Sequence, residues 1–474
     1  MPIRSEKERD ILIMVDMKAK PFYLSEEDCK WVEETIAGMT TEEKIGQLFF
    51  NMGSSRDEEY LKMTVDKYHI GGIRYNPATG AEVREQNRIL QENSKIPLII
   101  ACNTENGGNG ACTDGTMIGQ QTKIGATRDA RYAYELGRMS NKEAAAIGCN
   151  LSFAPVSDIL YNWENPVIGL RTYGNDVDRV CEMTKAYMDG AHTNEGFCCA
   201  AKHFPGDGLD FRDQHVADSV NDMSCEEWDA SYGKVYQNLI DNGLEAIMAG
   251  HIMQPAYTRH FNPGIKDEDI MPATLSPELI EGLLRGKLGF NGMVLTDASH
   301  MVGLTCCMKR SEMLPHTIAA GVDMFLFFNE MDEDFASMMA GYENGIITEE
   351  RLNDALHRIL ALKAHMGLHK KAKNEIVPPV EVMEQVVGCE EHKAMAREIS
   401  EKGITLVKYK DEDVLPMIPS RYKRIMIVSV SGLSAGVMGT MMAKYMGGGK
   451  KSPAERLRDK LIEKGFDAFI YESP

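Results

Sequence analysis

Short apolar runs alternate with longer amphipathic segments from residue 39 to residue 368. Eight such runs occur in order: IGQLFF (45–50), IGGIRY (70–75), IPLIIAC (96–102), NLSFAPV (150–156), FCCAAKHF (197–204), EAIMAGHI (245–252), GMVLTD (292–297) and DMFLFF (323–328). Between them lie helical patterns such as DARYAYELGRMSNKEAAAIG and EERLNDALHRILALKAHMG. Nearly continuous apolar runs of this length are typical of parallel strands covered by helices. The pattern therefore predicts an α/β fold, a (β/α)8 TIM-type barrel.

The first helix of this region has a defined start. Thr40 and Glu43 have the spacing of a capping box ahead of an apolar run, which predicts a helix beginning there. A doubly wound open sheet is the alternative fold. It would need no eighth unit, and it usually has a glycine-rich first turn that this sequence lacks.

The character of the chain changes after Leu368. We expect an N-terminal extension (1–38), the catalytic barrel (39–368), a linker (369–400) and a partial α/β C-terminal domain (401–474). The runs ITLVKY (404–409), RIMIVSVSG (424–432) and DAFIYES (467–473) are the predicted strands of that last part. A segment of about 70 residues is short for an independent α/β layer, so we expect a small or incomplete second domain.

Composition narrows the class of protein. The 474 residues are 43% hydrophobic and 26% charged, as in soluble globular proteins, and the net charge of −19 argues against nucleic acid or an anionic membrane as partner. The apolar run ILIMV near the start is too short for a signal peptide, and the 11 scattered cysteines form no disulfide framework. These features favour a cytoplasmic protein with reduced thiols. The 31 methionines are typical of core filler, with a copper site as the remote alternative.

Polar residues follow several of the predicted strands, at the end where a barrel places its active site. The polar candidates are Asn103, Glu105, Asp158, Arg171, Lys202, His203, Asp207, Asp213, His215 and Asp297. A carboxylate at such a position can act as a nucleophile, and a histidine beside an aspartate can transfer a proton. Each candidate also has a structural explanation: Asp297 could cap the next helix, Asp213 and His215 could form a local surface pair, and Lys202 and His203 could form internal ion pairs with Asp158 or Asp207.

The segment KHFPGDG, followed by LDFR and DQH, resembles glycoside hydrolase family 3, in particular its β-N-acetylglucosaminidase branch. Similar segments continue on both sides: MTTEEKIGQ, LSFAPVSDI, NPVIGLRTYG, IMAGHI, LGFNGMVLTDASHM and ITEERLNDALHRILALK. The resemblance covers residues 39–370 and extends more loosely into the second domain. It implies a retaining glycosidase that removes terminal non-reducing β-N-acetylhexosamine residues from a carbohydrate substrate, such as a cell-wall fragment, with no metal or other cofactor.

The resemblance also assigns roles to residues. It implies that Asp297 is the nucleophile, that His215 is the acid/base oriented by Asp213, and that the sugar hydroxyls are bound from the strand ends. The residues implied in sugar binding are Lys202, His203, Arg171, Asn103 and Glu105. Two positions depart from the family pattern. Asn103 stands where an aspartate usually grips the far hydroxyls, for which Glu105 can compensate, and Asp207 stands where many relatives have histidine.

Other functions stay open at this point. A histidine acid/base does not repel incoming phosphate, so a β-N-acetylglucosaminide phosphorylase is one alternative; a β-glucosidase of the same family and a sugar-binding protein without activity are others. A metal hydrolase would place zinc among His203, Asp207, Asp213 and His215. Barrel metallohydrolases typically carry an HxH motif after the first strand, however, and here that strand ends in Leu-Phe-Phe-Asn-Met. The sequence leaves the oligomeric state open.

Overall fold

The computed structural model describes residues 14–408, 415–429 and 451–471. The chain divides into two compact units, Met1–Ile404 and Thr405–Pro474. Each unit is described by itself.

The first unit is built on eight parallel strands in the order β10-β1-β2-β3-β4-β5-β7-β9. Their bounds are β1 Phe49–Met52, β2 Gly72–Arg74, β3 Ile99–Cys102, β4 Leu151–Ser152, β5 Cys198–Phe204, β7 Ala246–Ala249, β9 Met293–Thr296 and β10 Phe325–Leu326. The backbone of β1 pairs with β10, and a bridge between Leu295 and Met324 connects β9 to the segment entering β10. The sheet is therefore nearly closed, and the predicted (β/α)8 barrel is confirmed.

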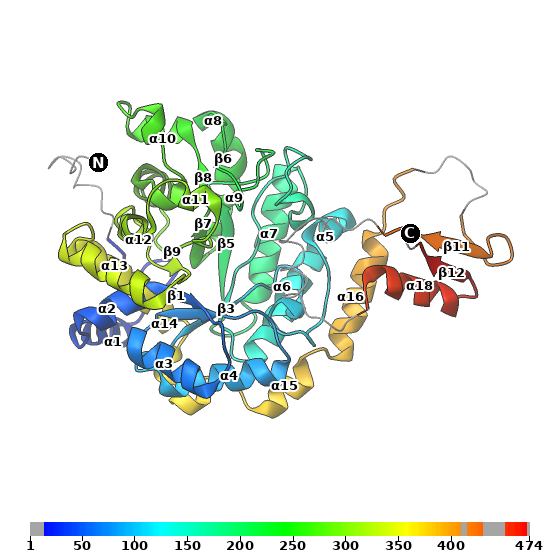
Figure 1. The fold of residues 1–474 in the computed structure, drawn as a ribbon, viewed down its shortest axis with the longest axis horizontal. Coiled ribbons are helices and arrows are strands. Elements are labelled where there is room, and N and C mark those ends of the chain that lie inside the picture. Colours follow the sequence, from blue (N-terminus) through cyan, green and yellow to red (C-terminus); the bar gives the residue numbers. More distant parts are fainter. Residues whose placement is uncertain (1–13, 409–414, 430–450, 472–474) are drawn as a thin grey trace. The chain divides into compact units, whose positions relative to one another are not determined.

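Helices surround these strands in Figure 1. They are α1 Glu26–Ala37, α2 Thr41–Gln47, α3 Glu58–Tyr68, α4 Gly80–Asn93, α5 Gln121–Thr127, α6 Ala130–Ala146, α7 Val177–Ala191, α8 Cys225–Trp228, α9 Lys234–Asp241, α10 Pro255–Phe261, α11 Val302–Thr305, α12 Arg310–Ala319, α13 Met331–Glu343, α14 Glu349–His365, α15 Val380–Val386 and α16 Glu390–Gly403. A π-helical segment, Glu278–Lys287, precedes β9. The capping box predicted at the start of α2 is present, because Glu43 N–H donates to Thr40 Oγ1 (3.2 Å) and Thr40 N–H to Glu43 Oε2 (2.9 Å).

A buried network of ion pairs holds the closing seam of the barrel. Asp323 exchanges backbone and side-chain hydrogen bonds with Val294, each 2.8 Å long. Its carboxylate also pairs with Arg285 at 2.9 Å and with Arg351 of α14. The carboxylate is thus surrounded by donors, which a charge in the interior requires.

Two flanking segments belong to the first unit. Phe22 and Val32, which precede the barrel, are almost fully buried, and α1 packs on α14. Residues 369–400, expected to be a linker, are instead part of the first unit, and most of them lie in helices or short turns. Ile376, Val377 and Ile399 are buried there, so this stretch is held by the same apolar burial as the rest of the unit.

The second unit contains two parallel strands, β11 (Arg424–Ile427) and β12 (Asp467–Ile470), with α18 (Pro453–Glu463) before β12. Both strands match predicted runs. The described part of the run ITLVKY, however, forms no strand, and Ile404 and Val407 are largely exposed. Residue 409 of this run lies outside the described residues.

Two further features concern the cysteines and the length of the helices. The 11 cysteines, which all lie within the described residues, are free. Among those residues, none of the helices combines the length and the apolar character needed to cross a bilayer.

Candidate active site

The loop that follows β5 carries the residues Asp207, Asp213 and His215. Its two motif glycines have positive backbone angles, φ +125° at Gly206 and +99° at Gly208. A Cβ atom on Gly206 would fall 2.2 Å from the ring of Tyr232, and one on Gly208 would fall 2.2 Å from the carbonyl oxygen of Ile159. Only glycine suits both the conformation and the space, so the spacing KHFPGDG has a steric cause.

Glu105 follows β3, and its carboxylate pairs with two cationic side chains. Arg171 Nε lies 3.2 Å from Glu105 Oε1, and Lys202 Nζ lies 3.5 Å from Glu105 Oε2. Burial by itself would raise the pKa of Glu105, but the two cations hold it at about 2. Lys202 and Arg171 are therefore both positioned by the Glu105 carboxylate.

His203 connects this cluster to the predicted nucleophile. Its Nδ1 lies 2.7 Å from Asp158 Oδ2, and its backbone N–H also donates to the Asp158 carboxylate. Its Nε2 lies 3.9 Å from Asp297 Oδ2 and 3.4 Å from Arg171 Nη2. The internal pair with Asp158 is therefore present, and it orients the other ring nitrogen toward the site.

Asp297 follows β9, where its backbone N–H donates to the carbonyl of Ala249 at the end of β7 (2.8 Å). Burial would raise the pKa of its carboxyl, but His203, His251, Lys202 and the N–H of Ala298 lower it to about 2. The hydrogen bond from that N–H to Asp297 Oδ1 is 2.7 Å long. Asp297 is thus ionised at neutral pH, as a carboxylate nucleophile must be.

The Asp213 and His215 side chains form a pair on the loop beyond β5. Asp213 Oδ1 accepts from the backbone N–H of His215 (2.8 Å) and lies 2.7 Å from His215 Nδ1. The imidazole is half exposed, and its Nε2 makes no hydrogen bond or ion pair with the described residues. No direct contact joins His215 to Asp297 within the described chain. The carbonyl oxygen of His215 accepts from the N–H of Val302 (3.1 Å), five residues after Asp297. The pair is therefore held against the segment that follows Asp297.

Gln214, between these two residues, fixes the loop to the barrel. Its side chain is fully buried; Nε2 donates to Asp207 Oδ2 (3.1 Å), and Oε1 accepts from the N–H of His251 (2.9 Å). The loop returns through β6 (Ser219–Val220), which pairs with β8 (Ile252–Met253). The loop is therefore tied to the strand ends of both β5 and β7.

Asp207 is the buried residue to which Gln214 ties the loop. Burial and the neighbouring charge of Asp158 raise its pKa to about 6. Its carboxylate accepts from Asn165 Nδ2 (2.8 Å), from Gln214 Nε2 (3.1 Å) and from the N–H of Gly208. The Asp207 side chain is thus engaged in holding the loop. This gives a structural role to the aspartate at a position where many relatives have histidine.

The zinc alternative does not fit this arrangement. His203 Nδ1 is engaged with Asp158, and Asp207 with three donors. Across the described residues, the side chains His203, Asp207, Asp213 and His215 are not among those whose donor atoms converge as metal ligands do.

Residues 40–362 match the family described as glycosyl hydrolase family 3 N terminal domain. The chain belongs to glycoside hydrolase family 3. Among its relatives, a β-N-acetylglucosaminidase/β-glucosidase of Cellulomonas fimi is 39% identical over 460 residues, covering 97% of this chain and 79% of the relative. A β-hexosaminidase of Haemophilus influenzae is 30% identical over 257 residues, covering 53% and 69%.

Solved structures extend the similarity of this family 3 chain. The β-glucoside phosphorylase BglX has a TM-score of 0.88 at 40% identity, with coverage of 97% of this chain and 79% of that one. A family 3 β-N-acetylglucosaminidase from Paenibacillus sp. has a TM-score of 0.76 at 27% identity, with coverage of 92% and 80%. The family membership makes the chain a glycosidase that acts on carbohydrate.

The predicted sugar-binding residues of the family 3 site differ in how they are connected to their neighbours. Lys202, His203, Arg171 and Glu105 lie in one connected cluster, whereas the side chain of Asn103 makes no hydrogen bond with the described residues.

Three site residues were missed by the sequence analysis. Arg74 ends β2, its buried Nε has no hydrogen-bond partner among the described residues, and burial lowers its pKa while Glu105 raises it. His251 follows β7, and its ring is held by Thr274 (2.8 Å) and the carbonyl of Ala298 (3.0 Å). Each is the second-last residue of a predicted strand run, so the strand-end rule could have found them. Gln214 carried no such signal.

Proposed function

We propose that this chain is a retaining exo-glycosidase that removes a terminal non-reducing β-N-acetylhexosamine, with Asp297 as nucleophile and His215 as acid/base. The observation that carries the proposal is the environment of Asp297, an ionised carboxylate at a barrel strand end with His203 Nε2 at 3.9 Å. A terminal sugar would be held by the cluster around Glu105 and by the amide of Asn103.

In the first step, an Asp297 oxygen attacks the anomeric carbon while the bond to the leaving oxygen breaks, and His215 Nε2–H gives its proton to that oxygen. Asp213, 2.7 Å from Nδ1, holds the imidazole in position and stabilises its charged form. In the second step, neutral Nε2 takes a proton from water as the water oxygen attacks the same carbon and Asp297 leaves. Two inversions give retention of configuration.

Phosphorolysis is the second candidate, favoured by the similarity to a β-glucoside phosphorylase. Phosphate would then replace water in the second step, and the product would be a sugar 1-phosphate. Neutral His215 presents no negative charge to an incoming phosphate, unlike a carboxylate base. The half-exposed loop position of His215 is consistent with access for either acceptor.

The test is a panel of 4-nitrophenyl β-glycosides of N-acetylglucosamine, N-acetylgalactosamine and glucose, each assayed with and without inorganic phosphate. We expect the N-acetylglucosaminide to have the largest kcat/KM. A preference for glucose would overturn the sugar assignment and favour a β-glucosidase. Turnover that requires phosphate, with sugar 1-phosphate seen by ³¹P NMR, would replace hydrolysis by phosphorolysis. Absence of turnover on every glycoside, with folded protein, would favour a sugar-binding protein. A cytoplasmic location, proposed from the free cysteines, is a separate expectation that fractionation of cells tests.

A further inference from the structure

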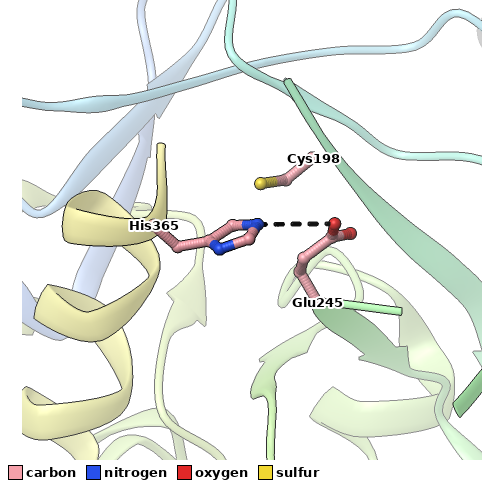
Figure 2. A group of neighbouring side chains, drawn as sticks. All are labelled: Cys198, Glu245 and His365. Atoms are coloured by element: carbon pink, nitrogen blue, oxygen red, sulfur yellow. Dashed lines mark ion pairs between the residues drawn. The ribbon is translucent and has the colours of Figure 1, made fainter. Parts of the chain in front are cut away.

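A cluster of potential metal ligands lies at the strand starts of the barrel, whereas Asp297 follows the end of a strand. Cys198 begins β5, Glu245 directly precedes β7, and His365 ends α14. The Sγ of Cys198, a carboxylate oxygen of Glu245 and a ring nitrogen of His365 all lie within 4.8 Å of one another. Figure 2 shows His365 Nε2 facing the Glu245 carboxylate, with the Cys198 sulfur beside them.

His365 has the tautomer that metal binding needs. Its Nδ1 lies 3.0 Å from the carbonyl oxygen of Phe22, to which only an N–H can donate. In the neutral ring the proton is therefore on Nδ1, and Nε2 presents a lone pair to Glu245 Oε1 at 3.9 Å. A backbone carbonyl that fixes the distal nitrogen in this way is the usual outer partner of a metal-bound histidine.

Glu245 is a buried carboxylate that needs a cation. It is 3% exposed, and Oε2 accepts from the N–H of Cys199 (3.1 Å). No lysine or arginine of the described chain pairs with it. His192 Nε2 lies 2.7 Å from Oε1, and although burial acts against it, the charge of Glu245 raises the pKa of His192. In the absence of a metal ion, a protonated His192 is therefore the group that can balance the charge of Glu245.

We propose that Cys198, Glu245 and His365 bind a single zinc ion that joins β5, β7 and α14 at the strand starts of the barrel. Thiolate, imidazole and carboxylate are the three ligand types of zinc proteins. The two anionic ligands and the neutral imidazole of His365 balance a charge of +2. The site is then neutral in a buried position, provided that His192 gives its proton to solvent as the ion binds. The thiol proton passes to solvent when the ion binds.

The dimensions suit this ion. Bonds of about 2.0 to 2.3 Å in a tetrahedron place neighbouring donor atoms roughly 3.3 to 3.8 Å apart, so the widest separation has to contract by about 1 Å. Rotation of the side chains supplies such a movement. His192 and His365 are each 29% exposed, so the cluster lies just below the surface and an ion can enter. A fourth position is left for water.

The first test uses the full chain, stripped with a chelator and then equilibrated with zinc chloride. We expect one zinc per chain after gel filtration, measured by mass spectrometry of the metal, and a higher Tm than for the stripped protein. With cobalt(II) in place of zinc, we expect a thiolate-to-cobalt charge-transfer band. Failure to retain zinc, or a cobalt spectrum without that band, overturns the proposal in favour of a protonated His192 that neutralises Glu245 alone.

The second test locates the site. Cys198→Ser should abolish the cobalt band, while Cys199→Ser, its equally buried neighbour on the same strand, should keep it. His365→Gln should weaken zinc affinity by roughly 100-fold or more, beyond the loss that an outer partner causes. Zinc bound equally by all three variants would place the ion elsewhere and overturn the assignment. If Cys198→Ser does not fold, His365→Gln and the wild-type cobalt spectrum still decide.

Discussion

Replacing Gln214 with alanine tests whether the acid/base loop depends on its anchorage. The side chain makes two buried hydrogen bonds, one to the Asp207 carboxylate (3.1 Å) and one from the N–H of His251 (2.9 Å). A bond to a charged group contributes about 1.5 to 3 kcal/mol and a neutral one about 0.5 to 1 kcal/mol. Loss of both bonds therefore lowers the free energy that holds the loop in its anchored position by roughly 2 to 4 kcal/mol.

This free energy sets the expected kinetic effect. If all of it favours positions in which His215 does not reach the leaving oxygen, the rate of proton donation falls by about 30- to 1,000-fold. That is within the ~10² to 10⁴ that a general acid contributes. Asp297 is not released, because Thr274 and the carbonyl of Ala298 still hold the ring of His251.

The assay is kcat/KM on a series of aryl glycosides whose phenols differ in acidity. Poor leaving groups should lose about 30- to 1,000-fold in Gln214→Ala, while activated ones, which need little protonation, should lose less than about tenfold. The matched control is Gln237→Ala on α9, whose side chain bonds to Asp241 and to the carbonyl of Leu288 far along the chain from the motif. Equal losses across the series would refute the reasoning, because they would mean that Gln214 supports the whole site and not the acid.

Three further predictions follow from the same geometry. Asp297→Ala should abolish turnover without lowering Tm by more than a few degrees. Activity near that of the wild type would contradict its role as nucleophile. Because the pKa of Asp297 is about 2, the acidic limb of the pH profile of kcat/KM should not come from this residue. His215→Ala should reduce kcat/KM by about 10² to 10⁴ on poor leaving groups and far less on activated ones, a difference that Brønsted plots measure. Asp207, whose pKa is raised to about 6, favours the protonated form in the folded state, so wild-type stability should fall as pH rises from about 4 to about 6. In Asp207→Asn this pH-dependent loss in the free energy of unfolding, roughly 3 kcal/mol, should be absent. Denaturation curves measured at each pH check this. An equal loss in wild type and variant would show that Asp207 is not the cause.

Much of the barrel and its site follows from the periodicity of the chain. Eight apolar runs give eight strands, and the barrel rule gathers their carboxyl ends, which is why Asp297, Lys202 and Glu105 could be grouped from the sequence. The ion pairs among them could not be predicted, because spacing along a strand does not determine which cation meets which carboxylate. That Lys202 and Arg171 both pair with Glu105 emerged only from the structure.

The errors have a common physical origin. The segment 369–400 contains charged residues and two prolines, which are typical of a linker, yet Ile376 and Val377 are buried in the first unit. The run ITLVKY has strand composition, but its residues 404–408 form no strand. Similarly, Gln214 is an ordinary polar residue in the sequence, and its importance comes from the two strand ends that it joins. In each case tertiary contacts outweigh local composition.

The seam of the barrel also constrains when the protein can fold. Phe49 in the first strand pairs with Phe325 in the last, and His365 contacts the carbonyl of Phe22 across 343 positions of sequence. During synthesis, the edge of β1 that pairs with β10 therefore has no partner until β10 has left the ribosome. Contacts so distant in sequence carry a high entropic cost of closure and slow the final step. Until β10 pairs with β1 the sheet keeps an open edge, and an open edge is the part of a sheet that is most exposed to pairing with other chains.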